Sequence, residues 1–367
     1  MNKLLFIVFA AFSAACSDTT PLPADPQATP ETRALYRNLF RIADEGVMFG
    51  HQDDALYGHD WKYEEGRSDV RECCGDYPAV FGWELGGLET GADRSIDDVP
   101  FAEITRLLCA AYGRGAVNTV SWHPQNPESG ASAWDGKTST AVSSILPGGA
   151  NHAQFRLWLP RLAGFFVGLK SADGTCVPVL FRPFHEHTGS GFWWGEAQCT
   201  PDEYKALWRF TVEYLRDVKG VHNLLYVYSP DLYRDAEHYT ERYPGDEWVD
   251  VLGLDAYHRP QDWDFLSGGE RMLSTLQRLG REHGKPTAFT ETGLEGIPDT
   301  AWWTRLLLPV IRGKGLSYVL VWRNAHDRPT HFFGPWHGHA SEPDFRKFAA
   351  NREQPVLFES QLPDMYH

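Results

Sequence analysis

The chain has 367 residues, of which 42% are hydrophobic and 14% aromatic, and its formal net charge is −15. This length and composition allow one large hydrophobic core, and a single α/β barrel commonly needs about 250 residues or more. The acidic balance argues against a nucleic-acid partner, whose phosphates need a basic face. A neutral ligand fits the charge better than an acidic one.

The first 16 residues have the pattern of an export signal. A short positive start is followed by an apolar run and by small residues ending at Cys16, and the run is too short to span a membrane. Ala-Ala-Cys is typical of a bacterial lipoprotein signal with lipidated Cys16, whereas Ser13 leaves simple cleavage as an alternative. We expect a flexible tether over residues 17–30 and one folded domain over 31–367. The protein is then exported and anchored through Cys16 to the outer membrane, on its cell-surface or periplasmic side.

Eight segments have the length and apolar content of buried strands. They cover residues 47–50, 79–83, 116–122, 177–184, 223–228, 249–254, 286–290 and 317–322. Helical spacing is found at 31–44, 101–114, 155–169, 201–219, 271–283, 301–313 and 343–350, and a short helix is expected within 235–243. This alternation, without an internal repeat or a second linker, predicts a single (β/α)8 barrel.

Polar or aromatic side chains follow nearly every predicted strand. In chain order they are His51, Gln52, Glu84, His123, His185, Glu186, Ser229, Asp231, Asp255, Tyr257, Glu291, Trp322 and Arg323. One such residue is easily a paired core group, but a whole rim of them is hard to explain structurally, because unpaired buried polar groups destabilise a fold. The pattern therefore predicts a polar cleft at the C-terminal face of the barrel.

Two carboxylates on this rim suggest glycoside hydrolysis, with a structural ion pair as the alternative. Glu186 and Glu291 follow the fourth and seventh strands, which lie on opposite sides of the barrel mouth. Glu186 is the expected acid/base, since His185 and neighbouring aromatic rings would desolvate it and raise its pKa. We expect Glu291 to be the nucleophile, kept ionised by Arg182 and Arg323. Tyr257 is expected to hydrogen-bond Glu291, and Trp322 to form the floor of the sugar subsite.

The aromatic residues after the fourth strand, Phe192, Trp193 and Trp194, are expected to provide stacking surface for sugar rings. Two loops, 125–149 and 324–342, are long enough to wall off one end of the cleft. The histidines of the second loop are expected to face substrate.

A metal or a serine triad is the less favoured chemistry. His185 and His187 alternate as zinc ligands on a strand do, with His123 and His51 as possible partners, but no HExxH spacing follows. No G-x-S-x-G elbow is present. The five cysteines after Cys16 contain no CxxC pair, and their odd number leaves at least one without an intrachain disulfide partner. We expect neither a metal nor a cofactor.

The residues also carry a family resemblance. The matching segments are FGHQD (49–53), SWHP (121–124), RPFHE (182–186), TG (188–189), FWWG (192–195), YSPD (228–231), GLDAY (253–257), TETG (290–293), WRN (322–324) and LPDMY (362–366). They resemble glycoside hydrolase family 26, the β-mannanase family, over nearly the whole mature chain. The resemblance implies a (β/α)8 catalytic domain with Glu186 as acid/base and Glu291 as nucleophile. It further implies substrate contacts at His123, His185, Tyr257, Trp322 and Arg323, and we add His51, Trp193, Trp194, Asp231 and Asp255.

The resemblance implies a monomeric, retaining β-1,4-mannanase that cuts mannan, galactomannan or glucomannan internally. One departure is Gly191, where many mannanases of the family carry a tryptophan, and its absence removes stacking surface near the cleavage point. Release of mannobiose from chain ends, and activity on mixed-linkage β-glucan or β-1,3-xylan, remain alternatives. A non-catalytic glycan-binding lipoprotein is an alternative of another class, but such a protein need not have kept both carboxylates.

Overall fold

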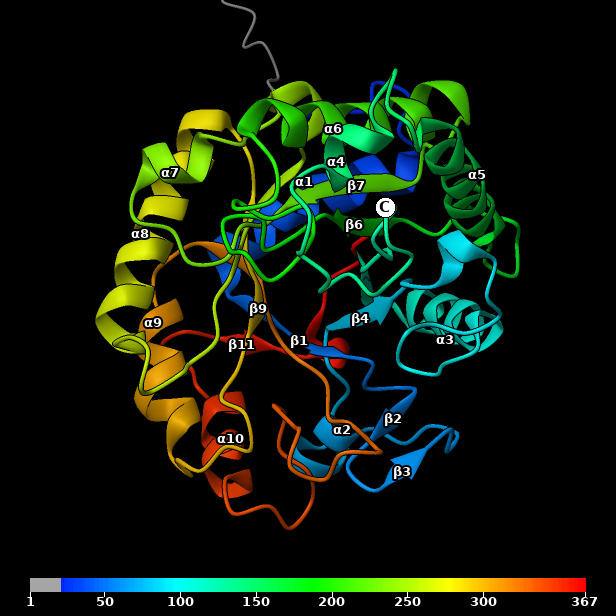
Figure 1. The fold of residues 1–367 in the computed structure, drawn as a ribbon. Helices are drawn as coiled ribbons and strands as arrows, with labels where there is room; N and C mark the ends of the chain where they lie inside the picture. Colours follow the sequence, from blue (N-terminus) through cyan, green and yellow to red (C-terminus); the bar gives the residue numbers. More distant parts are fainter. Residues whose placement is uncertain (1–20) are drawn as a thin grey trace, which may run out of the picture.

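The computed structural model describes residues 21–367, so the predicted signal and Cys16 lie outside the described part. Eight parallel strands form a closed ring (Figure 1). They are β1 (Val47–Gln52), β4 (Val80–Glu84), β5 (Val117–Trp122), β6 (Val179–Pro183), β7 (Leu224–Tyr228), β8 (Val251–Asp255), β9 (Thr287–Thr292) and β10 (Leu316–Val321). Pairing of β10 with β1 closes the ring, with Met48 opposite Tyr318. The predicted (β/α)8 barrel and its eight strands are confirmed.

Helices surround this ring (Figure 1). The longer ones are α1 (Pro30–Glu45), α3 (Phe101–Arg114), α5 (His152–Gly168), α6 (Pro201–Glu213), α8 (Phe265–His283) and α10 (Glu342–Ala349). Helix α8 begins earlier than predicted because the side chain of Asp264 caps it, accepting from the backbone N–H groups of Leu266 and Ser267. Residues 303–311 form the π-helical η4 (Trp303–Leu307) and the short α9 (Leu308–Ile311), where Pro309 lacks an N–H for regular helix bonding.

Several short elements were not predicted from the sequence. They are the hairpin of β2 (Tyr57–Gly58) and β3 (Trp61–Lys62), α2 (Asp69–Cys74), η1 (Leu88–Thr90), α4 (Ala141–Ile145), η3 (Asp246–Trp248), β11 (Val356–Leu357) and η5 (Glu359–Gln361). The short helix expected within 235–243 is α7 (Ala236–Thr240), and η2 (Tyr214–Val218) continues α6. Elements of two to six residues carry too few residues for a periodic signal.

The barrel interior is plugged at its N-terminal end. Inward side chains such as Met48 and Leu320 form one buried cluster with Leu35, Leu39 and Ile42 of α1. Strand β10 is joined to α1 by a hydrogen bond from the Ser317 hydroxyl to a helix carbonyl at 2.8 Å. With this end closed by apolar packing, the C-terminal ends of the strands form the open face.

The segment before α1 lies against the barrel. Ala24 donates its backbone N–H to Asp250 at 2.6 Å, and Thr29 donates to the carbonyl of His222 at 2.9 Å. Asp25 and Ala28 are buried. A flexible tether extending to residue 30 is therefore wrong for residues 24–29, because backbone bonds hold them to the domain. No helix among residues 21–367 is long and apolar enough to cross a membrane.

Candidate active site

Glu186 and Glu291 line one cavity of about 280 Å³ at the C-terminal face of the barrel. Glu186 lies three residues after β6, and Glu291 lies near the end of β9. The lining also includes His123, Trp134, His185, Phe192, Tyr257, His258, Arg259, Glu295, Trp322, His331 and Phe333. The two predicted catalytic carboxyls therefore face a common space framed by aromatic rings.

The backbone is irregular at both carboxylates. Between β8 and β9 the register shifts, so that Leu254 pairs with Phe289 but Asp255 pairs with Glu291, leaving Thr290 as the extra residue of a β-bulge. On the other side of the cavity, Phe184 and Glu186 have positive φ angles of 49° and 52°. Such angles are unfavourable for residues with a Cβ and concentrate at functional sites.

Both carboxylate oxygens of Glu291 accept a hydrogen bond. Arg182 forms a buried ion pair with Oε1, and the hydroxyl of Tyr257 donates to Oε2 at 2.5 Å. Arg182 is itself fixed by a second bond, to Asp255 at 2.8 Å. These contacts hold the carboxylate of Glu291 in a single orientation.

Glu186 has the opposite environment. It is partly buried, and burial raises its pKa well above the ordinary value, with further upward contributions from the charges of Glu291, Asp231 and Asp255. The Arg182 guanidinium acts in the opposite direction but is outweighed. A carboxyl group in this setting remains protonated at higher pH, which a proton donor requires.

Two further cavities adjoin the first. One, of about 700 Å³, shares His123, Trp134, Trp322 and His331 with it and extends over Ile96, Asp97, Asp98, Arg323, His326, Asp327 and Arg328. The other, of about 350 Å³, shares Trp134, Glu186, Phe192, Tyr257 and Arg259 and extends over Ser190, Gly191, Asp231, Leu232, Asp255, Ala256, Asp262 and Trp263. We call them the first-side and second-side cavities. Together the three form a groove, in which Glu186 lines the middle and second-side parts and Glu291 only the middle.

Most of the predicted substrate-contact residues line this groove. His123, His185, Tyr257 and Trp322 line the middle cavity, Arg323 the first-side cavity, and Asp231 and Asp255 the second-side cavity. Asp255 is almost fully buried and accepts hydrogen bonds from Arg182, Ser229 and Thr290, so it supports the floor more than it offers a free surface.

Three sequence-based assignments need correction. Trp193 and Trp194 have no exposed surface, and their indole N–H groups donate to the carbonyls of Pro124 and His185. They hold the loop after β6 in place instead of presenting a stacking surface. His51 is also fully buried, bonded to Asp54 at 2.8 Å, and does not line the groove.

The predicted role of Arg323 beside Glu291 is also wrong. Its guanidinium pairs with Asp97 at 2.9 Å and contacts the hydroxyl of Tyr57 at 3.3 Å. Arg323 therefore contributes to the wall of the first-side cavity, and Arg182 alone of the two arginines pairs with the carboxylate of Glu291.

The sequence analysis did not identify Trp134, the aromatic residue that lines all three cavities of the groove. Trp134, from the loop over 125–149, lines all three parts of the groove and is 54% exposed. Its ring stacks on His123, with centroids 5.2 Å apart and planes at 16°. Trp134 does not directly follow a strand, so the strand-end pattern could not identify it. The sequence features that pointed to it were the large number of tryptophans and the length of this loop. The predicted wall loop over 324–342 contributes His326, Arg328 and His331.

His187 does not join His185. Its ring is fully buried between Tyr204 and Tyr228, at centroid distances of 4.4 and 4.6 Å. In the part of the chain that the structure describes, no group of three or more His, Cys, Asp or Glu side chains is arranged to hold a metal ion.

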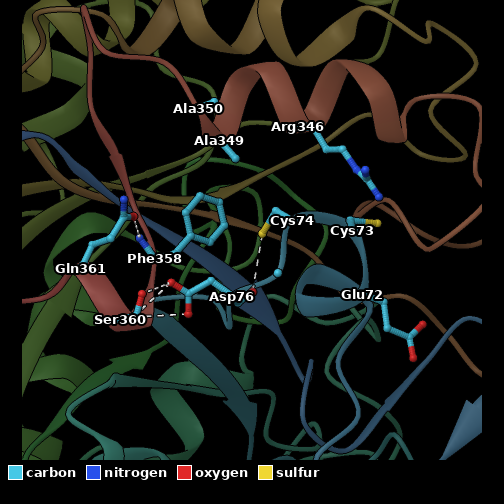
Figure 2. A pocket seen from close by; sticks show the side chains of 11 residues that line it. Glu72, Cys73, Cys74, Asp76, Arg346, Ala349, Ala350, Phe358, Ser360 and Gln361 are labelled. Carbon is cyan, nitrogen blue, oxygen red and sulfur yellow. Dashed lines mark hydrogen bonds between the residues drawn. The ribbon is translucent and has the colours of Figure 1, made fainter.

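A separate cavity of about 590 Å³ lies between α2, α10 and the segment around η5 (Figure 2). Its lining includes Cys73, Cys74, Asp76, Arg346 and Ser360, and none of the predicted site residues. Figure 2 shows the side chains of Cys73 and Cys74 pointing in different directions, and the five cysteines of the described region carry free thiols.

Known proteins share the sequence family and the fold of this chain. The model of glycosyl hydrolase family 26 matches residues 24–268. The chain belongs to this family. A family 26 β-mannanase from Bacteroides ovatus has a similar structure, with a TM-score of 0.89 and 45% identity over 92% of this chain and 98% of that one.

Curated relatives of family 26 are similar in sequence. A mannan endo-1,4-β-mannosidase of Bifidobacterium adolescentis is 35% identical over 352 residues, covering 89% of this chain but 34% of its own length. A protein of the same name from Bacillus subtilis is 29% identical, covering 81% of this chain and 80% of its own. The chain thus spans about a third of the first relative and most of the second.

Proposed function

We propose that this protein is a retaining endo-β-1,4-mannanase that cuts mannan, galactomannan or glucomannan as a monomer. The observation that carries the proposal is the shared cavity of Glu186 and Glu291, one with a raised pKa and the other fixed by two donors. The mannanase names of its family 26 relatives give the substrate class.

A proton donor and a fixed carboxylate in one cavity are the two groups that a double displacement uses. Glu186 gives its proton to the oxygen of the leaving sugar while the carboxylate of Glu291 bonds to the anomeric carbon, breaking the glycosidic bond. In the second half, Glu186 takes a proton from water, and the water oxygen displaces Glu291 from the anomeric carbon. Because Glu186 alone of the two lines the second-side cavity, we assign the leaving sugar to that side.

The proposal is tested by incubating the protein with mannan, glucomannan, lichenan and β-1,3-xylan and following the products over time. An early ladder of manno-oligosaccharides, with the β-anomer formed first in NMR spectra, is the expected result. Cleavage confined to lichenan or xylan, or first formation of the α-anomer, would contradict it. Binding of mannan without any cleavage would favour a glycan-binding protein.

Release of mannobiose from chain ends is the second candidate. The β2–β3 hairpin contacts two lining residues of the first-side cavity: Lys62 bonds to Asp98 at 3.2 Å, and Tyr57 packs on His326 at a centroid distance of 5.1 Å. A hairpin held beside this cavity favours an obstruction on this side of the groove. The same time course separates the candidates, because endwise cutting gives one dimeric product from the start.

We also propose that the protein is exported and lipid-anchored at Cys16 on the bacterial outer membrane. The support is the sequence pattern ending at Ala-Ala-Cys. Metabolic labelling with a fatty-acid probe should mark the full chain and leave a Cys16→Ser variant unmarked. Labelling of both proteins, or of neither, would contradict the anchor.

A further inference from the structure

Glu84 is a buried carboxylate that does not contact Glu291 directly and is linked to it through two histidines. It ends β4 and is 1% exposed. Its Oε1 accepts from the backbone N–H groups of Gly86 and His123, at 2.5 and 3.0 Å. Its Oε2 accepts from the Ser121 hydroxyl at 2.5 Å and faces Nδ1 of His123 at 2.7 Å. Surrounded by donors, Glu84 is held as an anion, and Nδ1 of His123 carries a hydrogen.

The other nitrogen of His123 meets a second histidine. Its Nε2 lies 3.0 Å from Nε2 of His185, with the two rings perpendicular at a centroid distance of 4.4 Å. One hydrogen must lie between these nitrogens, since two would clash and none would leave two lone pairs facing each other. On the far side, Nε2 of His185 is 3.8 Å from Oε1 of Glu291. Four strands, β4, β5, β6 and β9, thus contribute one chain of contacts that ends at the predicted nucleophile.

The surroundings decide which histidine holds the shared hydrogen. Burial and the adjacent Arg182 charge lower the pKa of His185 well below its ordinary value. Burial opposes protonation of His123 as well, but the charge and hydrogen bond of Glu84 outweigh it and raise the pKa of His123. The same pairing lowers the pKa of Glu84 despite its burial. Both shifts favour placing the shared hydrogen on Nε2 of His123 and leaving His185 neutral.

We propose that Glu84 is a positioning residue for the glycosidase reaction. It holds His123 as a cation, and through His123 it fixes the neutral state and ring orientation of His185 beside Glu291. This inference rests on the proposed function. A positive charge on His123 then lies near the carboxylate of Glu291.

The charge state of His123 is set by groups from several elements. They are Glu84 from β4, Asp97 from the loop after β4, Arg182 from β6, His185 from the loop after β6, and Glu291 from β9. Uncharged rings of Trp134, Phe192 and Trp322 complete its surroundings. Among these groups Glu84 is the one that bonds directly to a His123 nitrogen and carries a negative charge.

The first test reads the charge state directly in the wild-type protein. NMR of protein labelled with ¹⁵N-histidine, assigned by difference from His123→Gln and His185→Gln variants, should show both nitrogens of His123 protonated at neutral pH. His185 should be neutral, with its hydrogen on Nδ1. A neutral His123 at that pH, titrating at or below about 6.5, would overturn the proposal.

The second test uses Glu84→Gln, with Glu84→Asp as the conservative variant. Glu84→Gln should lower the pKa of His123 in the same NMR titration and reduce kcat by about 10-fold with a smaller change in KM. Glu84→Asp should restore part of the His123 pKa and part of kcat. A His123 titration that does not change in Glu84→Gln would overturn the proposal.

Glu89→Gln is the matched control. Glu89 is an equally buried carboxylate that bonds to Trp122 and to the backbone of Gln125, and it does not contact His123. Its loss should affect stability and leave the His123 titration unchanged. Should Glu84→Gln fail to fold, the wild-type NMR spectrum still decides. If the wild type does not cleave mannan, the proposed function is refuted. The charge state of His123 is still tested, because the NMR measurement requires no activity.

Discussion

The hydroxyl of Tyr257 donates to Oε2 of Glu291 at 2.5 Å, on the opposite oxygen from the Arg182 ion pair. Tyr257 follows β8 and Glu291 lies on β9, so the bond joins neighbouring strands at the barrel mouth. Burial and the charge of Glu291 raise the pKa of the Tyr257 hydroxyl, so that it remains a donor throughout the working pH range. Glu291, the proposed nucleophile, is therefore held by two donors, Arg182 of β6 and Tyr257 just after β8.

Tyr257→Phe removes one of these donors and leaves the ring in place. We expect kcat/KM on manno-oligosaccharides to fall about 10- to 100-fold, since a hydrogen bond to a charged group contributes about 1.5–3 kcal/mol. The matched control is Tyr233→Phe, which removes a hydroxyl bonded to the Met272 carbonyl away from the groove. Equal activity of Tyr257→Phe and wild type would show that the bond does not assist the nucleophile.

The roles of Glu186 and Glu291 should be distinguishable with substrates whose leaving groups differ in acidity. Glu186→Gln cannot protonate a poor leaving group, so its turnover of mannan should fall by about 100-fold or more, while an aryl mannobioside with an acidic phenol should still form the glycosyl-enzyme rapidly. Glu291→Gln should lose activity on both substrates, because no bond to the anomeric carbon can form. A pre-steady-state burst of phenol from Glu186→Gln alone is the expected reading, and a burst from Glu291→Gln would reverse the assignment.

The sequence was sufficient for the architecture because the barrel strands carry a strong local signal. Each is a short, mostly apolar run that leads into a polar or aromatic group, and all eight were predicted to within a few residues. The β2–β3 hairpin and β11 were missed, since two-residue strands are defined by tertiary pairing. The π-helical turn of η4 also depends on packing around Pro309 instead of on local pattern.

For the site, sequence reasoning identified side chains at strand ends but not their direction. The strand-end rule brought Glu186, Glu291, His123 and Tyr257 correctly to one cavity. It also assigned Trp193 and Trp194 to the groove, although the loop after β6 turns their rings inward. Whether an aromatic side chain in a loop packs under it or over the groove is set by loop conformation, which no residue pattern here encodes.

This distinction predicts different effects for two tryptophans. Trp134→Ala removes an exposed ring that lines the whole groove, so KM for manno-oligosaccharides should rise about 3- to 10-fold, with little change in thermal stability. Trp194→Phe should instead lower the melting temperature, because it removes the donor to the His185 carbonyl from a fully buried site. Kinetics and thermal unfolding of both variants check this, and a selective KM effect in Trp194→Phe would restore its assignment as a sugar contact.

The raised pKa of Glu186 also predicts a pH-dependent stability. A carboxyl whose pKa is higher in the folded than in the unfolded protein stabilises the fold below its unfolded value of about 4.3, and this contribution is lost as pH rises through the folded pKa. Glu186→Gln is uncharged at every pH and avoids that loss. The melting temperature of Glu186→Gln should therefore exceed that of the wild type by an amount that grows from pH 5 to pH 8. A difference that is constant or shrinks over this range would show that Glu186 is ionised in the folded protein without penalty.

Gly191 lines the second-side cavity, where the leaving sugar is proposed to bind, and a Cβ at this position meets no atom within 4 Å. Gly191→Trp should thus fold normally and add a stacking surface, lowering KM for mannohexaose about 3- to 10-fold, as expected for about 1 kcal/mol of aromatic contact. Gly189→Ala is the opposite case, since its Cβ would meet the Asp231 carboxylate and disturb the same loop. If Gly191→Trp leaves KM for mannohexaose unchanged, the second-side cavity does not hold the leaving sugars, and the orientation assigned from Glu186 must be reversed.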